Sequence, residues 1–240
     1  MRRIKVKHFL QDPAHCAVAS CAVVANYYNK EIDYNYAKEL AYKKISKNIK
    51  DEGLDSGQIC LLLNYLGFNK VTLVSSDLDI FDYTWEKYGK RKLKEVLKNT
   101  KNKKKDDGDK ELVGNVYKWY VKKGYNNVIK IDYDFGKYIK KHLNRKKPVI
   151  LTFNWTMYMK FAKAGEDNKE DPINGDYEEH AVAVNGYDNN GIWVVDSHHK
   201  YYKYKRKKYR RGFYKMKWEH FFSCAHQGDV YLPDDYCEDL

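Results

Sequence analysis

The sequence predicts an α+β fold in one domain spanning residues 1–240, with helices packed on an antiparallel sheet that lies later in the chain. Helix patterns fill the first part of the chain, whereas apolar runs of strand length and a hairpin turn dominate residues 149–196. Although 32% of the residues are charged, 43% of the 240 are hydrophobic. That proportion suffices for one sizeable core.

The first expected elements surround an apolar helix. Ile4 to Phe9 is expected to form a short strand, and Asp12 is expected to cap a helix that has Pro13 in its first turn. Residues 16–28 (CAVASCAVVANYY) are apolar on nearly all sides. This pattern predicts a buried helix rather than an amphipathic one.

Two more helices and a strand are expected next. One helix covers residues 34–47. The other opens at Asp55-Ser56-Gly57-Gln58, runs to Leu66 and is ended by Gly67. Val71 to Val74 is then apolar and β-branched enough for a short strand.

Residues 81–127 differ in character from their surroundings. The segment 98–110 (KNTKNKKKDDGDK) is a run of charges, which predicts a solvated, mobile loop. Helices are expected on either side of it, at about 85–97 and 111–123. We therefore expect 81–127 to be an insertion on the surface of the domain.

The second half of the chain predicts the sheet. A helix is expected over 134–143, with Asp134 at its start, and a strand over 149–155 after the Lys147-Pro148 break. Residues 180–187 and 192–196 are expected to form strands joined by a hairpin turn at 188–191.

Residues 200–217 alternate basic and aromatic side chains, and we call this segment the basic ribbon. It is expected to form a strand pair or hairpin. The mixture suits a single-stranded nucleic-acid groove, but a strand edge protected by lysines explains the same pattern. A short helix over 218–224 and a closing strand over 230–232 complete the domain.

Four residues have the types and contexts needed for thiol acyl transfer. Cys16 stands near the expected start of the buried helix, where free backbone N–H groups and the helix dipole lower a thiol pKa. His180 opens a strand and is a candidate to stabilise the thiolate and then protonate a leaving amine. Asp196 ends the neighbouring strand and suits the role of orienting the imidazole. Gln11 is a candidate oxyanion donor together with the Cys16 N–H.

Plainer interpretations exist for other reactive residues. A cysteine on an apolar helix is usually a small core residue, which is our interpretation of Cys21 and Cys60. His15 is a rival base, but adjacent helical residues do not face each other. We expect no cofactor and no metal, because the residues that suggest zinc lack paired ligand spacing; these are His198, His199, Cys224 and His226.

The order Gln–Cys–His–Asp resembles that of papain-like cysteine peptidases. It is most similar to the double-glycine leader peptidases, family thirty-nine of the cysteine peptidases, and their stand-alone relatives. The matching segments are Gln11, 16–19 (CAVA), 26–28 (NYY), 55–68 (DSGQICLLLNYLGF), 147–150 (KPVI), 180–188 (HAVAVNGYD) and 192–196 (IWVVD).

The resemblance implies a papain-like fold and a cofactor-independent thiol hydrolase acting on peptide or isopeptide bonds. It implies Cys16 as nucleophile, His180 as base and acid, Asp196 as orienter and Gln11 as oxyanion donor. Three positions depart from the family pattern. Ala17 replaces the usual glycine after the cysteine, Gln11 is one position closer to the cysteine, and Ser197 follows the aspartate where proline is common.

Composition bears on partners and location. The formal net charge of +12 favours acidic peptide or protein substrates by steering. Five cysteines, an odd number, argue against a disulfide framework, and the N-terminus lacks the apolar run of a signal peptide, so a cytoplasmic location is expected. No apolar window is long enough for a membrane span. Two other functions remain open: an acyl transferase on the same fold, and a basic nucleic-acid-binding module without catalysis.

Overall fold

The computed structural model describes residues 3–165, 169–198, 212–225 and 228–237. Their strands form one sheet in the order β2-β1-β7-β3-β4-β5-β6, in which only β1 and β2 pair in parallel. The strands are β1 (Phe68–Ser75), β2 (Val128–Ile131), β3 (Val149–Asn154), β4 (Glu179–Asp188), β5 (Gly191–Val195), β6 (Phe213–Lys217) and β7 (Asp229–Tyr236).

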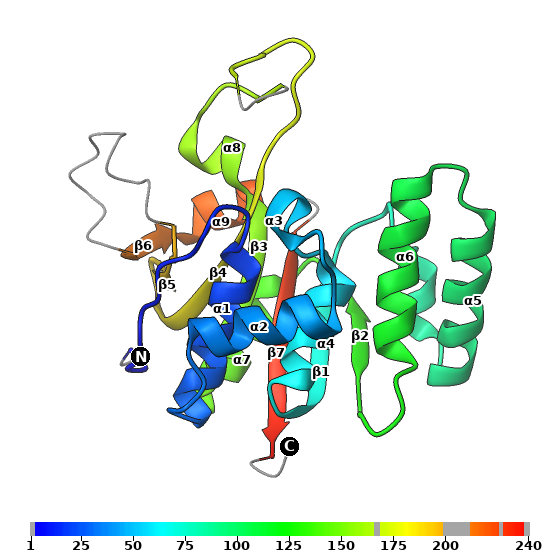
Figure 1. The fold of residues 1–240 in the computed structure, drawn as a ribbon, viewed down its shortest axis with the longest axis horizontal. Coiled ribbons are helices and arrows are strands. Elements are labelled where there is room, and N and C mark those ends of the chain that lie inside the picture. The colour runs from blue at the N-terminus through cyan, green and yellow to red at the C-terminus, as the bar shows by residue number, and fades with distance from the viewer. Residues whose placement is uncertain (1–2, 166–168, 199–211, 226–227, 238–240) are drawn as a thin grey trace.

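Helices cover both faces of this sheet (Figure 1). In chain order they are α1 (Cys16–Tyr28), α2 (Tyr34–Lys44), α3 (Ile49–Glu52), α4 (Ser56–Tyr65), the 3₁₀ helix η1 (Tyr83–Lys87), α5 (Lys90–Lys103), α6 (Asp107–Tyr120), α7 (Phe135–Asn144), α8 (Trp155–Met159) and α9 (Trp218–Cys224). Helices α1 and α4 pack on one face, and α7 and α9 on the other. The expected α+β fold, with N-terminal helices packed on a mostly antiparallel sheet, is confirmed.

The alternation of small and large side chains in β4 brings α1 close to the sheet. Ala181 and Ala183 belong to the core on the α1 side, whereas Val182 and Val184 belong to the core on the opposite side. Successive strand residues point to opposite faces, so both faces of β4 are buried. Because alanines face the alanine-rich α1, the helix approaches the strand closely where β4 begins.

The predicted N-terminal caps are correct for two helices and wrong for one. Asp55 caps α4 in a capping box with Gln58, and Asp134 caps α7. Asp12, by contrast, does not cap α1. Its carboxylate pairs with Lys38 at 2.5 Å, and His15 occupies the cap position without a side-chain cap bond.

The segment before α1 also differs from expectation. Residues 4–9 form no strand, although Ile4 N–H donates to the Asn185 carbonyl at 2.7 Å and the Asn185 amide donates back to the Ile4 carbonyl at 2.7 Å. Pro13 lies in a turn that precedes α1 rather than in its first turn. The helix therefore begins at Cys16 itself, whereas the capping pattern predicted a start at Pro13.

The loop expected over 98–110 is wrong. Helix α5 runs through residue 103 and α6 begins at 107, with Asp106 as its cap. Lysine is a good helix former, and Leu93, Leu97 and Val113 turn inward to the core while the lysines remain outside. The charge run is thus the solvated face of a helical hairpin.

Several other expectations differ in extent. Helix α2 ends at Lys44 rather than residue 47, and β3 ends at Asn154 because Trp155 opens α8. The last strand, β7, is longer than expected and lies in the middle of the sheet. Within the basic ribbon, residues 200–211 lie outside the described residues. Among the helices that the structure describes, none is both long enough and apolar enough to cross a bilayer.

Candidate active site

The candidate site lies where the start of α1 meets the start of β4. Cys16 is the first residue of α1 and His180 the second residue of β4. Ser20, one helical turn after Cys16 and on the same helix face, donates to the Ala181 carbonyl at 3.1 Å. This buried bond ties the helix to the strand directly beside the histidine.

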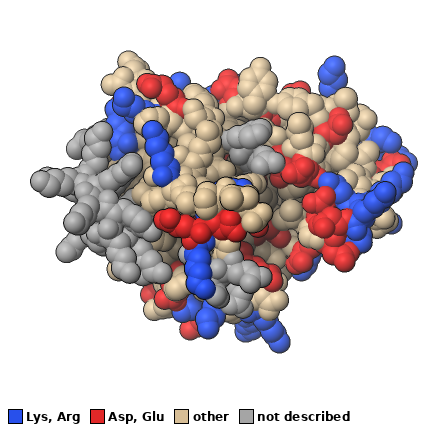
Figure 2. Space-filling view, turned by 90° about the horizontal axis from the view of Figure 1, so that it is seen from above, with Lys and Arg blue, Asp and Glu red and all other residues tan. Residues whose placement is uncertain are grey.

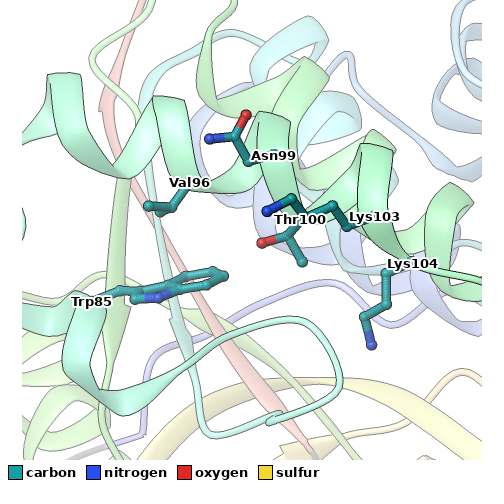
Figure 3. Close-up of a pocket in the computed structure, with 6 residues that line it drawn as sticks. All are labelled: Trp85, Val96, Asn99, Thr100, Lys103 and Lys104. Carbon is teal, nitrogen blue, oxygen red and sulfur yellow. The ribbon is translucent and has the colours of Figure 1, made fainter.

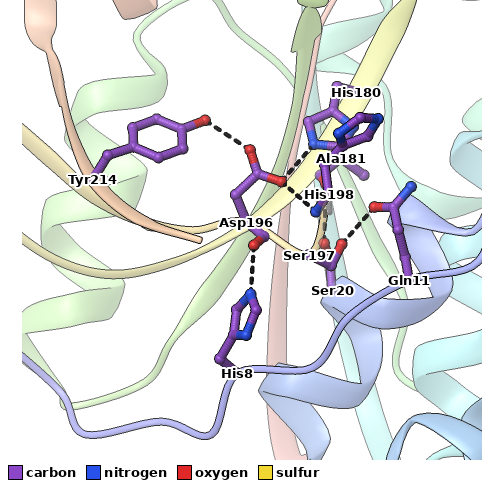
Figure 4. A network of polar contacts seen from close by, with 9 residues as sticks. All are labelled: His8, Gln11, Ser20, His180, Ala181, Asp196, Ser197, His198 and Tyr214. Carbon is purple, nitrogen blue, oxygen red and sulfur yellow. Dashed lines mark hydrogen bonds and ion pairs between the residues drawn. The ribbon is translucent and has the colours of Figure 1, made fainter. Parts of the chain in front are cut away.

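His180 and Asp196 form a buried pair (Figure 4). His180 Nε2 lies 2.9 Å from Asp196 Oδ1, and the two residues are 4% and 0% exposed. Asp196 directly follows β5, whose pairing with β4 brings the carboxylate to the imidazole. His198 N–H donates to the same Oδ1 at 2.8 Å, and Tyr214 OH donates to Oδ2 at 3.0 Å. Asp196 is therefore held in place from several directions.

Cys16 and His180 interact, and each shifts the pKa of the other toward its charged form. Because Nε2 is engaged by Asp196, Nδ1 is the ring nitrogen left for the sulfur. Burial acts to raise the pKa of the Cys16 thiol, but the hydrogen bond and positive charge of His180 outweigh burial and hold that pKa below its usual value. Burial acts to lower the pKa of His180, while the charge and hydrogen bond of Asp196 raise it to about 10. The arrangement favours a thiolate beside an imidazolium.

Aromatic rings shield this charge pair from water. The Trp155 ring centroid lies 4.3 Å from that of His180, and the Phe153 centroid lies 6.1 Å away. Trp155 itself is buried. Electrostatic interactions strengthen when water is excluded, so these rings reinforce the hold of Asp196 on His180.

Gln11 reaches the site through Ser197, the residue after Asp196. Gln11 N–H donates to the Ser197 carbonyl at 3.0 Å, and Ser197 Oγ donates to Gln11 Oε1 at 2.6 Å. The Gln11 amide nitrogen points away from Ser197 in Figure 4. The structure thus joins Gln11 to the strand end that carries Asp196.

The rival residues lie elsewhere. His15 is buried, with its Nδ1 2.5 Å from the Pro13 carbonyl and its Nε2 3.0 Å from Tyr42 OH. Burial raises the pKa of the Cys21 and Cys60 thiols, as expected for core cysteines. Of the residues considered for zinc, His199 and His226 lie outside the described residues.

A pocket of about 410 Å³ lies away from the candidate site, between η1 and α5 (Figure 3). It is lined by Trp85, Val96, Asn99, Thr100, Lys103 and Lys104. Lysine ammonium groups and a threonine hydroxyl without an adjacent base do not form an activated nucleophile. None of the candidate catalytic residues Gln11, Cys16, His180 and Asp196 lines this pocket.

Figure 2 shows acidic side chains in the middle and right of one face of the molecule, interspersed with basic ones. Glu179 directly precedes His180. Desolvation and the nearby carboxylates of Asp229 and Asp77 raise the pKa of Glu179 to about 7. A carboxyl that is only partly ionised near neutral pH therefore directly precedes the histidine in β4.

The sequence interpretation missed four residues that support the site. Ser20 carried a usable signal, because it lies four positions after Cys16 on the same helix face. Ser197 was noted only as a departure from proline. Tyr214 fell within the basic ribbon, and His8, whose Nε2 lies 2.7 Å from the Asp196 carbonyl, had no local signal.

This chain is similar to one family model and to a solved structure, and the family model supports the resemblance. One solved structure, described as a double glycine motif protease from an AMS/PCAT transporter in complex with the leader peptide, is 14% identical and aligns over 97% of this chain and 94% of its own, with a TM-score of 0.42. No curated protein matches. The model of the Peptidase_C39 like family matches residues 3–225, nearly the whole chain. The protein belongs to the Peptidase_C39 like family.

Proposed function

We propose that the protein is a cysteine peptidase that hydrolyses peptide or isopeptide bonds through a thioester acyl-enzyme. The observation that carries the proposal is the buried His180–Asp196 pair beside Trp155, which interacts with Cys16 and lowers the pKa of its thiol. Nucleophile, base and orienting group in contact are the requirements for covalent catalysis by a thiol.

The geometry supports a two-stage reaction. The Cys16 thiolate attacks the carbonyl carbon, and the tetrahedral oxyanion accepts hydrogen bonds from the Cys16 N–H and the Gln11 side-chain amide. The C–N bond then breaks as the His180 imidazolium gives its proton to the leaving amine. In the second stage His180 takes a proton from water, the resulting hydroxide attacks the thioester, and the acid product leaves with regeneration of the Cys16–His180 pair.

The local charge bears on the substrate. Glu179, which directly precedes His180 and has a pKa of about 7, carries part of a negative charge near neutral pH, so we expect it to disfavour acidic residues next to the scissile bond. Steering by the net charge of +12 acts at longer range, on the encounter. The preference for acidic peptides that the net charge predicts therefore concerns the approach of the substrate to the protein and not the residues beside the scissile bond.

The proposal is tested with an iodoacetamide probe and a peptide library read by mass spectrometry. Wild-type protein should label at Cys16 near neutral pH and cleave peptides, and Cys16→Ala should do neither. Cys21→Ala is the matched control, because Cys21 lies buried on the same helix. Equal labelling and cleavage by Cys16→Ala and the wild type would refute the assignment. Added amines report on the transferase alternative, since a transferase yields amide products instead of free acids.

A further inference from the structure

We propose that Ser197 is a positioning residue that orients the Gln11 amide so that its nitrogen faces the reacting carbonyl oxygen. This inference rests on the proposed peptidase function and extends it to a residue at which the chain departs from the family pattern. The evidence is the pair of hydrogen bonds between Ser197 and Gln11, one through the backbone and one through the side chains.

The two residues are locked together in a buried setting. Ser197 is 2% exposed and Gln11 is 7% exposed. The backbone bond of 3.0 Å fixes the Gln11 main chain, and the side-chain bond of 2.6 Å fixes the far end of its side chain. A glutamine held at both ends loses most of the rotamer freedom that it would otherwise surrender on binding substrate.

The direction of the side-chain bond matters because an amide has one accepting end and one donating end. With Oε1 occupied by the Ser197 hydroxyl, Nε2 is the end of the amide left to donate. Among the described residues, none accepts a hydrogen bond from Gln11 Nε2. The nitrogen is therefore a preorganised donor, whereas a flipped amide would present an oxygen to the oxyanion and repel it.

Ser197 is itself held firmly by its neighbour. Asp196 N–H donates to the Gly212 carbonyl at 2.6 Å, and the Asp196 carbonyl accepts from His8 Nε2 at 2.7 Å (Figure 4). Gly212 is required there, because a Cβ on it would lie 2.1 Å from His8 Nε2. The dipeptide Asp196-Ser197 thus serves both halves of the reaction: one side chain orients the base and the next orients the oxyanion donor.

The experiment compares Ser197→Ala and Ser197→Thr with the wild type in peptide turnover and in iodoacetamide labelling. Alkylation by iodoacetamide forms no oxyanion, so both variants should label Cys16 at close to the wild-type rate. Ser197→Ala should lose about 10²-fold in kcat with little change in KM, near the lower end of the loss when such a donor is removed. Ser197→Thr keeps the hydroxyl and should restore most of kcat.

A double-mutant cycle separates positioning from a merely structural role. If Ser197 acts through Gln11, adding Ser197→Ala to Gln11→Ala should cost little further activity. Independent, multiplicative losses would overturn the inference, as would wild-type kcat in Ser197→Ala. Gln11→Glu, which keeps an acceptor for Ser197 but replaces the donating nitrogen, should be as damaging as Gln11→Ala; full activity in that variant would also overturn it. Failure of the peptidase proposal is distinguishable, because it would show as unchanged cleavage by Cys16→Ala.

Discussion

Replacing Asp196 by asparagine should remove the charge that keeps His180 protonated while leaving an acceptor for its Nε2–H. The pKa of His180 is raised from 6.5 to about 10. Since one pKa unit corresponds to 1.36 kcal/mol, the imidazolium is stabilised by about 5 kcal/mol. Coulomb attraction over the 2.9 Å between His180 and Asp196 gives a similar size, about 6 kcal/mol at an effective dielectric constant of 20.

The sign of the pH dependence follows from these directions. In the wild type the reactive pair is lost as pH falls through the lowered pKa of Cys16, and lost again as pH rises through the raised pKa of His180. In Asp196→Asn burial dominates, so the pKa of His180 falls and that of Cys16 rises. Labelling of Cys16 should therefore shift to higher pH, and kcat/KM near neutral pH should fall roughly 10²–10⁴-fold, the usual worth of general acid–base catalysis.

The assay is the rate of iodoacetamide labelling at Cys16 as a function of pH, measured by mass spectrometry of the intact protein. A Cys237→Ala background removes the other partly exposed thiol. Asp188→Asn is the matched control, because Asp188 forms an ion pair with Lys215 at 2.6 Å outside the site. Superimposable labelling profiles for Asp196→Asn and the wild type would refute the electrostatic argument.

Two other substitutions test the supports of the site. Tyr214→Phe removes the hydroxyl that donates to Asp196 Oδ2 and should lower the free energy of unfolding by about 1.5–3 kcal/mol. The loss of activity should be smaller than in Asp196→Asn, and an unchanged denaturant midpoint together with unchanged activity would contradict this role. Ser20→Ala breaks the hydrogen bond to the Ala181 carbonyl and should lower the free energy of unfolding in urea by about 0.5–1.5 kcal/mol. It should slow turnover more than the control Ser223→Ala, which removes a hydroxyl bonded to an exposed carbonyl within α9. Equal turnover in the two variants would show that the bond between α1 and β4 does not position the catalytic residues.

Local chemistry made several elements readable from the sequence. The apolar run 16–28 had to be buried, and it forms α1, although the helix does not start at Asp12 and Pro13 as expected. Asp55 and Gln58 carry the capping box of α4, and the Asp188–Gly191 turn joins two strands whose register places Asp196 beside His180. These features depend on residues only a few positions apart in the sequence, so they can be recognised from the sequence alone.

Other features required the tertiary structure. The sequence named Gln11, Cys16, His180 and Asp196 by type and order, but only the packing of α1 on β4 brings the thiol to the imidazole. The charge run 98–110 was mistaken for a loop, because Leu93 and Leu97, which precede it on α5, become informative only once a core is present for them to join.

The chain by itself determined the helices that have clear caps, the hairpin and the chemical types in the site. Folding decided the central place of β7, the hold of Tyr214 and His8 on Asp196, and the bond from Ser197 to Gln11. The physical reason is sequence separation. A hydrogen bond between residues 186 positions apart leaves no periodic trace in either segment, and it exists only when the sheet and its covering helices have closed around it.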